Sequence, residues 1–269
     1  MRLQIARSKW DMDELPLDRF LSTIAAAGFG ASDIHIPSLR EPPEETAALH
    51  ARHGIALVAM ITSEGRTAGE HCSSLGDRFA LAARCAPVHI NCHTGKDTFS
   101  RDENLAVIRE AIALGKRFGI PVSHETHRGR ATYSAPATAE LLRAIPSLRL
   151  TADFSHWCCV HESLLGDQPE ALALAIERTD YIHARVGHAE GPQVSDPRAP
   201  EWGAELEAHL GWWRRIAEAR RAAGSETLIV CPEFGPAPYM PLLPRSRTPV
   251  ADLWEITLFM KDLLKKNLG

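Results

Sequence analysis

The sequence predicts a closed α/β barrel in which eight parallel strands alternate with eight helices, the (β/α)8 or TIM barrel. Segments of strand character alternate with segments of helical periodicity about eight times, at a spacing of roughly 30 residues, which is typical of parallel βαβ units. The length of 269 residues fits the ~250 residues that one such barrel needs. No low-complexity linker or charge run divides the chain, so we expect one barrel domain over residues 1–269.

An open doubly wound sheet is the competing architecture. It is disfavoured because no Gly-x-Gly-x-x-Gly follows the first strand and no Walker-type loop occurs anywhere in the chain. A closed barrel also leaves no unpaired sheet edge.

In the first half of the chain, several of the predicted helices end at a glycine, which is a common stop signal. The segment 55–61 is almost wholly apolar, as expected of a strand covered on both faces. The expected strands are 3–6, 33–36, 55–61 and 88–93, and the expected helices are 17–27, 43–53, 69–84 and 104–118.

In the second half, each predicted strand ends in an ionisable residue. The last two helices carry apolar stripes, for example Leu206, Leu210 and Trp213, at helical spacing. The expected strands are one that carries Glu125, then 148–154, 180–185 and 228–233, and the expected helices are 136–145, 169–178, 203–223 and 250–265.

Composition favours a globular protein outside the membrane, with 45% hydrophobic and 24% charged residues. The net charge of -4 argues against a nucleic-acid partner, because duplex binding usually needs a basic face. The first residues lack an apolar leader, and no apolar run approaches the ~18 residues of a membrane helix. We therefore expect a cytoplasmic protein without a membrane partner, whose six cysteines are reduced.

Four predicted strands in succession deliver an acid or a histidine at the end of the strand: Glu125, Asp153, His183 and Glu233. In a closed α/β barrel these ends meet at the face that carries the active site. Side chains alternate along a strand, so if these four face the barrel axis, the alternate positions face the helices. Those positions are apolar, namely Val122, Leu150, Ala152, Ile182, Leu228 and Val230. His124 is the exception and needs a hydrogen-bond partner in the loops.

Three carboxylates and one imidazole form an oxygen-rich set suited to one divalent metal ion. Hard oxygen donors with one nitrogen favour Mn²⁺ or Mg²⁺, with Co²⁺ and Zn²⁺ as alternatives, and we expect Mn²⁺. Without a cation, three acids packed together repel one another and take up protons. The sequence therefore predicts a metal held by Glu125, Asp153, His183 and Glu233.

These residues resemble the Glu, Asp-x-x-His, His, Glu series of the xylose isomerase-like barrels. The resemblance lies in His-Glu125-Thr-His, Ala-Asp153-Phe-Ser-His156, Tyr-Ile-His183 and Pro-Glu233-Phe-Gly-Pro, and it spans essentially the whole chain. That superfamily contains sugar and sugar-phosphate isomerases and epimerases, inosose dehydratases and, more distantly, endonuclease IV.

The resemblance implies a metal-dependent sugar isomerase or epimerase in which His156 touches a substrate oxygen. A cation bridging a carbonyl and the neighbouring hydroxyl acidifies the C–H between them, and removal of that proton gives an enediolate. Glu125 and Glu233 are the candidates to remove and return the proton. The resemblance also implies a small carbohydrate substrate and a homodimer or homotetramer.

The chain departs from the ketose epimerases of this superfamily at two places. After Glu125 it carries the basic run Thr126-His-Arg-Gly-Arg130 instead of an acid, and after His183 it has Arg185-Val-Gly-His188 instead of Glu-Asn-x-Arg. These changes favour a sugar acid or sugar phosphate, with Arg128, Arg130 or Arg185 as the anchor and His188 as a further contact.

Other substrate contacts are predicted from position alone. Asn91, His93 and Lys96 follow the fourth strand and are candidates to line the site. Trp10 and Trp157 are candidates for an apolar wall against a sugar ring. Two Pro-rich segments, 187–202 and 235–249, are long enough to cover the site as lids, and Tyr239 in the second is a candidate contact.

Three other functions remain open at the level of sequence. A metal-dependent dehydratase acting on an inosose or a dehydroshikimate-like substrate uses the same residues. An endonuclease IV-like phosphodiesterase needs three zinc ions, and the end of the third strand, Met60-Ile-Thr-Ser63, supplies no ligand for them. A non-catalytic sugar-binding barrel is the third.

Overall fold

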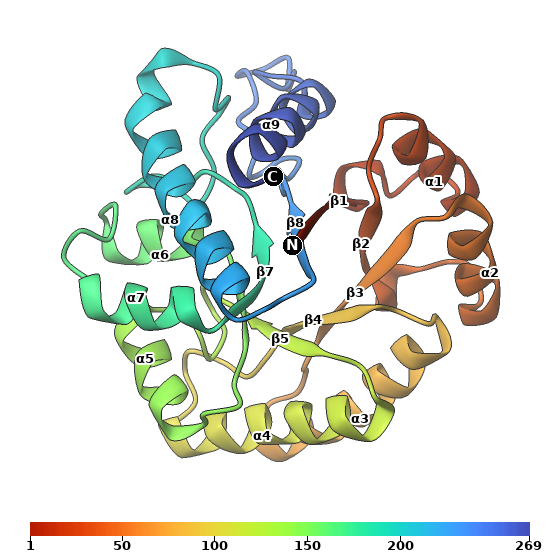
Figure 1. The fold of residues 1–269 in the computed structure, drawn as a ribbon, viewed down its shortest axis with the longest axis vertical. Coiled ribbons are helices and arrows are strands. Elements are labelled where there is room, and N and C mark those ends of the chain that lie inside the picture. The colour runs from red at the N-terminus through yellow and green to blue at the C-terminus, as the bar shows by residue number, and fades with distance from the viewer.

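Eight parallel strands close into one barrel in the computed structural model, which describes all residues 1–269. Each strand pairs with the next one in sequence, and β8 pairs with β1 through a register that includes Ile5 opposite Val230. Figure 1 shows the strands at the centre and the helices around them. The strands are β1 (Arg2–Ser8), β2 (Ala31–His35), β3 (Ala56–Thr62), β4 (His89–His93), β5 (Val122–Glu125), β6 (Leu150–Ala152), β7 (Thr179–His183) and β8 (Thr227–Cys231).

Nine α-helices cover the outside of the barrel, because β6 is followed by two helices and every other strand by one. Three short 3-10 turns, η1 (Trp10–Met12), η2 (Ile36–Ser38) and η3 (Pro200–Trp202), lie in the loops. The helices are α1 (Leu17–Ala26), α2 (Pro43–His53), α3 (Ala68–Arg84), α4 (Arg101–Phe118), α5 (Ala135–Ala144), α6 (Phe154–His161), α7 (Pro169–Glu177), α8 (Gly203–Ala222) and α9 (Leu253–Leu268). The prediction of a single (β/α)8 barrel is confirmed.

The helix boundaries follow from local capping chemistry. Thr67 and Ser100 begin α3 and α4 with capping boxes, in which Glu70 and Glu103 reach back to the first residues. Gly54 and Gly119 end α2 and α4 in the left-handed conformation that glycine adopts without a steric penalty.

Most predicted boundaries differ from the observed ones by one to three residues, and two of these differences have a local cause. The last helix begins at Leu253, after the cap residue Asp252, and not at residue 250. The predicted strand 148–154 is limited to Leu150–Ala152, because Asp153 turns the chain into α6, a helix that the sequence analysis did not identify.

The main hydrophobic core lies between the barrel and the helices. It contains Leu150, Ala152, Ile182, Leu228 and Val230, and Val122 packs against it, so all six positions predicted to face the helices do so. A smaller apolar cluster of Ala6, Ala31, Val58, Tyr181 and Cys231 fills part of the barrel interior. The alternation predicted for the strands therefore holds.

The middle of the barrel interior is polar, and its polar groups bond to one another. The Ser123 hydroxyl lies 2.6 Å from His89 Nε2 and 2.5 Å from the Thr151 hydroxyl, so three neighbouring strands are joined across their inward faces. On the outer side, His124 finds its predicted loop partner, since its Nδ1 lies 2.7 Å from the Thr94 hydroxyl. These side chains are thus each hydrogen-bonded just below the strand ends, although His124 Nε2 has no partner.

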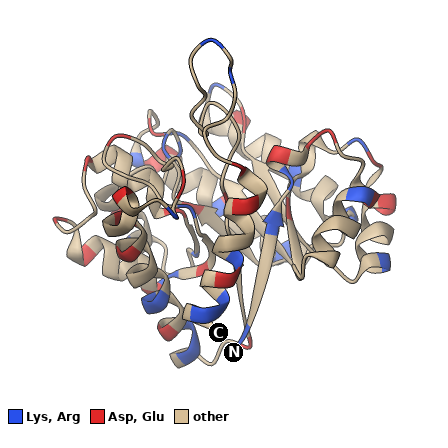
Figure 2. Ribbon diagram, turned by 90° about the horizontal axis from the view of Figure 1, so that it is seen from above, with Lys and Arg blue, Asp and Glu red and all other residues tan.

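Charged residues of both signs are interspersed along the outer helices, and the two termini lie together at one end of the barrel (Figure 2). None of the helices has the combination of length and apolarity needed to cross a membrane. All six cysteines are free.

Candidate metal centre

The four residues predicted to bind a metal converge at the carboxyl ends of β5 to β8. Glu125, Asp153, His183 and Glu233 each offer one donor atom, and these atoms all lie within 4.8 Å of one another. His183 Nδ1 lies 2.9 Å from Glu233 Oε2 and 3.5 Å from Glu125 Oε2. All four side chains are buried.

Each donor is placed by its own local structure. Glu125 and His183 are the last residues of β5 and β7. Asp153 follows β6 and caps α6, where its carboxylate accepts from the backbone N–H of Ser155 at 3.2 Å. Glu233 lies two residues beyond the end of β8.

The segment after Glu233 is held by one side chain of the loop after β7. The Gly235 N–H donates to Gln193 Oε1 at 2.7 Å, and Gln193 Nε2 donates to the Gly235 carbonyl at 3.1 Å. The two Pro-rich segments predicted as lids are therefore joined to each other.

The electrostatics of the four side chains show mutual repulsion and compensation. Burial, together with Glu233 and Glu125, raises the pKa of Asp153 to about 6, although Arg185 opposes this. Burial would lower the pKa of His183, but Glu233, Glu125 and Asp33 raise it well above its ordinary value. Burial would raise the pKa of Glu125, but His93 and His183 hold it well below its ordinary value. The cluster therefore attracts positive charge strongly.

The residues present fit a divalent cation. His183 Nδ1 and Glu233 Oε2 are buried without a hydrogen-bond partner, and both belong to the four-donor cluster. An imidazole nitrogen and three carboxylates match the donor preference of Mn²⁺ and Mg²⁺. A cation between these atoms would satisfy both unpartnered donors and offset the repulsion of the acids.

Arg185 is part of the cluster and not a free substrate anchor. Its guanidinium is 2% exposed and pairs with Asp153, lies 3.6 Å from Glu233, and donates to His156 Nε2 at 2.7 Å. Burial opposes its charge, but Asp153 and Glu233 hold its pKa above the ordinary arginine value. One guanidinium thus offsets part of the charge of three carboxylates.

Polar side chains of β4 contact the Glu125 carboxylate. Asn91 Nδ2 donates to Glu125 Oε2 at 2.6 Å, and His93 Nε2 lies 2.8 Å from the same oxygen. The His127 ring lies between His93 and His156, with ring centroids 4.6 and 3.8 Å away. Burial and His93 lower the pKa of His127 to about 3, so this ring is neutral at neutral pH.

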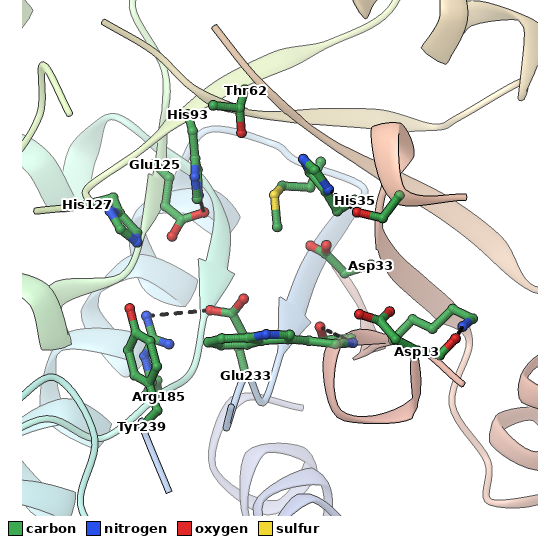
Figure 3. A pocket seen from close by; sticks show the side chains of 15 residues that line it. Asp13, Asp33, His35, Thr62, His93, Glu125, His127, Arg185, Glu233 and Tyr239 are labelled. Carbon is green, nitrogen blue, oxygen red and sulfur yellow. Dashed lines mark hydrogen bonds and ion pairs between the residues drawn. The ribbon is translucent and has the colours of Figure 1, made fainter. Parts of the chain in front are cut away.

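A cavity of about 330 Å³ opens above the cluster, within the range of small-molecule sites. Of the four donors, Glu125 and Glu233 line the cavity (Figure 3), while Asp153 and His183 are fully buried behind them. The other lining residues are Ser8, Lys9, Trp10, Asp13, Asp33, His35, Ser38, Met60, Thr62, His93, His127, Arg185 and Tyr239.

The aromatic wall of the cavity consists of Trp10 and Tyr239, whose rings meet edge to face at 5.0 Å. Glycine is required at position 235, since a Cβ there would lie 2.3 Å from the Trp10 ring. Trp157, the other predicted wall residue, is fully buried in the core and donates to the Thr132 carbonyl at 2.9 Å. The structure therefore brings together Trp10, Tyr239, His93 and Arg185 at the cavity.

The other predicted contacts do not line the cavity, namely His156, His188, Arg128, Asn91, Lys96 and Arg130. His156 is fully buried behind Arg185 and His127. His188 forms a turn with Gly191 and packs on Trp202 at 4.9 Å. Arg128 lies just outside, with its guanidinium 5.1 Å from the Tyr239 ring centre.

Several lining residues were missed from the sequence, above all Asp33, Lys9, His35 and Asp13. For Asp33 the signal was present: in β2, the sequence Ala31-Ser-Asp-Ile-His35 gives Asp33 the same inward parity as Ala31. Lys9 and Asp13 lie in irregular chain after β1, where no periodicity indicates direction.

No protein-family model matches the chain, and no curated protein matches it. Solved structures do match over almost the whole barrel. A xylose isomerase-like TIM barrel protein from Mycobacterium smegmatis in complex with magnesium has a TM-score of 0.60 at 14% identity, over 88% of this chain and 92% of that one.

Two further structures are similar to nearly the full chain. D-allulose 3-epimerase from Methylomonas sp. in complex with D-allulose has a TM-score of 0.65 at 12% identity, over 99% of this chain and 97% of that one. The probable 3-DHS dehydratase AsbF from Bacillus anthracis has a TM-score of 0.62 at 14% identity, over 99% and 100%. The chain therefore has the xylose isomerase-like barrel fold, as its motifs predicted.

Proposed function

We propose that the protein is a divalent-metal-dependent isomerase or epimerase of a sugar or a sugar derivative that contains a carbonyl group. The observation that carries this proposal is the convergence of three carboxylates and one imidazole within 4.8 Å beneath a cavity. The similarity of the fold to D-allulose 3-epimerase supports it. Mn²⁺ is the proposed metal, with Mg²⁺, Co²⁺ and Zn²⁺ as alternatives.

Glu125, Asp153, His183 and Glu233 would hold the cation. When bound, it would withdraw electrons from a substrate carbonyl and so acidify the neighbouring C–H. Glu125 and Glu233 are the members of the cluster that line the cavity, so both reach a bound substrate.

One of these carboxylates takes the proton from carbon, and the electron pair left behind forms the enediolate. The same or the other carboxylate then returns the proton. Return to the opposite face of the same carbon gives the epimer, and return to the adjacent carbon gives the isomer. Asp153 and His183, which lie behind the cavity surface, take no part in the proton transfer.

The cavity walls position the substrate. Trp10 and Tyr239 offer an apolar surface to the C–H face of a sugar. The neutral His127 ring lines the same cavity beside Glu125 and is available to a substrate hydroxyl. These groups also displace water from the carboxylates that move the proton.

The substrate class that the charges favour is a sugar acid or sugar phosphate. Arg128 contacts Tyr239 at the cavity edge and has no carboxylate within ion-pair distance, while Arg185 is already paired with Asp153. An anionic group of the substrate would supply the missing partner of Arg128.

A dehydratase is the second candidate, because the fold is also similar to that of the probable 3-DHS dehydratase. Removal of the same proton followed by loss of a neighbouring hydroxyl would need only an acid beside Glu125. An endonuclease IV-like activity is less favoured, since β3 presents Met60 and Thr62 to the cavity and no metal ligand.

Substrate screening in deuterated water tests the proposal, using keto sugars, sugar acids, sugar phosphates and inososes with added Mn²⁺. An isomer or epimer that carries solvent deuterium on carbon, or that shows internal proton transfer, is the expected result. A product lighter by one water identifies the dehydratase. Turnover with neither deuterium incorporation nor internal transfer contradicts the proton-transfer mechanism, and failure to bind Mn²⁺ in calorimetry favours a non-catalytic barrel.

A further inference from the structure

Asp33 is a buried carboxylate at the centre of the site that the metal cluster does not include. It lies in the middle of β2 and reaches toward β7 on the other side of the barrel. The side chain is 2% exposed and lines the cavity near Glu233 (Figure 3).

Two groups of β7 bond to the same oxygen of Asp33. The Tyr181 hydroxyl donates to Asp33 Oδ2 at 2.5 Å, and His183 Nε2 lies 3.2 Å from that oxygen. Tyr181 and His183 are both fully buried. Because a phenol is a rigid donor held by core packing, Tyr181 fixes where Asp33 Oδ2 lies.

The contact with Asp33 decides which nitrogen of His183 is available to bind a metal. An ionised carboxylate only accepts hydrogen bonds, so His183 Nε2 must carry the hydrogen. The Asn91 amide nitrogen also lies 3.5 Å from Nε2, but one of its hydrogens goes to Glu125 at 2.6 Å, and Asp33 Oδ2 at 3.2 Å is the closer partner of Nε2. His183 Nδ1 is therefore the nitrogen directed at the proposed metal position, where it faces Glu233 and Glu125 at 2.9 and 3.5 Å. A bound cation would take the place of a proton held there.

We propose that Asp33, held by Tyr181, is a positioning residue that keeps His183 in the Nε2–H tautomer with Nδ1 directed at the metal position. This inference rests on the proposed function. A carboxylate behind a metal-bound histidine fixes the ring orientation and raises its basicity, and loss of such a partner typically lowers metal affinity 10- to 100-fold.

The test is Mn²⁺ binding by calorimetry in Asp33→Asn, Tyr181→Phe and the wild type. We expect Asp33→Asn to weaken Mn²⁺ binding about 10- to 100-fold at unchanged stoichiometry, and Tyr181→Phe to weaken it less. Ser32→Ala is the matched control: Ser32 is the neighbour of Asp33 in β2, but it bonds His50 of α2 on the outer side at 2.8 Å. This variant should bind as the wild type does.

A second readout separates positioning from a general loss of stability. In ¹⁵N spectra of the Zn²⁺-loaded protein, with His183 assigned by its absence in His183→Asn, the wild type should show a protonated Nε2 and a metal-bound Nδ1. Tyr181→Phe keeps the ring volume, so this measurement stands even where Asp33→Asn fails to fold.

The outcomes are distinguishable. A wild type that binds no metal contradicts the proposed function and, with it, this inference. A wild type that binds Mn²⁺, with Asp33→Asn and Tyr181→Phe binding equally tightly, or with metal on Nε2, overturns the role of Asp33 alone.

Discussion

The two halves of the barrel contribute different things to the site. Strands β5 to β8 and the segments directly after them supply all four donors of the proposed metal centre and Arg185. Strands β1 to β4 and their loops supply no donor to that cluster but most of the cavity wall, including Trp10, Asp33 and His93. The proposed reaction chemistry therefore lies mainly in the second half and the cavity wall mainly in the first, although Asp33 of β2 contacts His183 and Tyr239 of the second half belongs to the wall.

The largest expected effect comes from the proton carriers of the second half. Glu125→Gln and Glu233→Gln keep the side-chain shape but remove a base, and each should lower kcat at least ~10³-fold. His93→Gln, a first-half variant beside Glu125, should lower it far less. The measurement is kcat and KM on the substrate found by screening, and equal losses in all three variants would remove the distinction between the halves.

Buried histidines outside the four-donor cluster make the stability of the fold depend on pH. His183 faces acids, whereas burial lowers the pKa of His89 in β4 to about 4, and also that of His209 in α8. The unfolded value is about 6.5, so the unfolded chain binds protons between pH 6.5 and 4 while the folded chain does not. The free energy of unfolding therefore falls as the pH drops through this window, by up to about 3 kcal/mol for each histidine.

His89→Gln checks this assignment, because glutamine can still bond Ser123 but does not titrate. Urea unfolding from pH 7 to pH 4 should show a shallower pH dependence in the variant than in the wild type. An unchanged slope would show that His89 does not contribute to acid sensitivity.

The first-half wall is tested by Trp10→Ala. Loss of the indole removes the apolar surface against Tyr239 and should raise KM about 10- to 100-fold. Metal stoichiometry should not change, because Trp10 is not one of the four donors. A loss of metal in this variant would contradict the separation of wall and chemistry.

The smallest effect on ligand binding is expected from Arg128 at the edge of the cavity. Arg128→Met should weaken binding of D-fructuronate and D-fructose 6-phosphate about 10-fold, and D-fructose hardly at all. Arg130→Met is the matched control, since Arg130 has no contact with Tyr239. Isothermal titration with the three ligands also separates a carboxylate from a phosphate preference, and equal losses for all three would contradict an anion site.

The same division explains how much the sequence could predict. The four donors of the second half lie at the ends of apolar strands, where the alternation of side chains along the strand predicts which way each one points. The structure brings these donors together, namely Glu125, Asp153, His183 and Glu233. The barrel itself followed from the repeated strand–helix pattern, and the six apolar positions do face the helices.

The residues of the cavity wall were harder to predict from the sequence. Lys9 and Asp13 lie in irregular loops, where side-chain direction depends on tertiary contacts, and Arg185 was read as a free anchor although Asp153 pairs with it. Asp33 was missed although its parity was readable, because a single acid within a short strand gave no reason to assign it a function.

Metal content of the purified protein tests the central claim most directly. After saturation with Mn²⁺ and removal of excess ion, the wild type and Trp10→Ala should each retain about one divalent ion per chain, whereas Asp153→Asn and His183→Asn should retain almost none. A wild type without bound metal, or ligand variants that keep a full equivalent, would contradict the assignment of Glu125, Asp153, His183 and Glu233 as a metal centre.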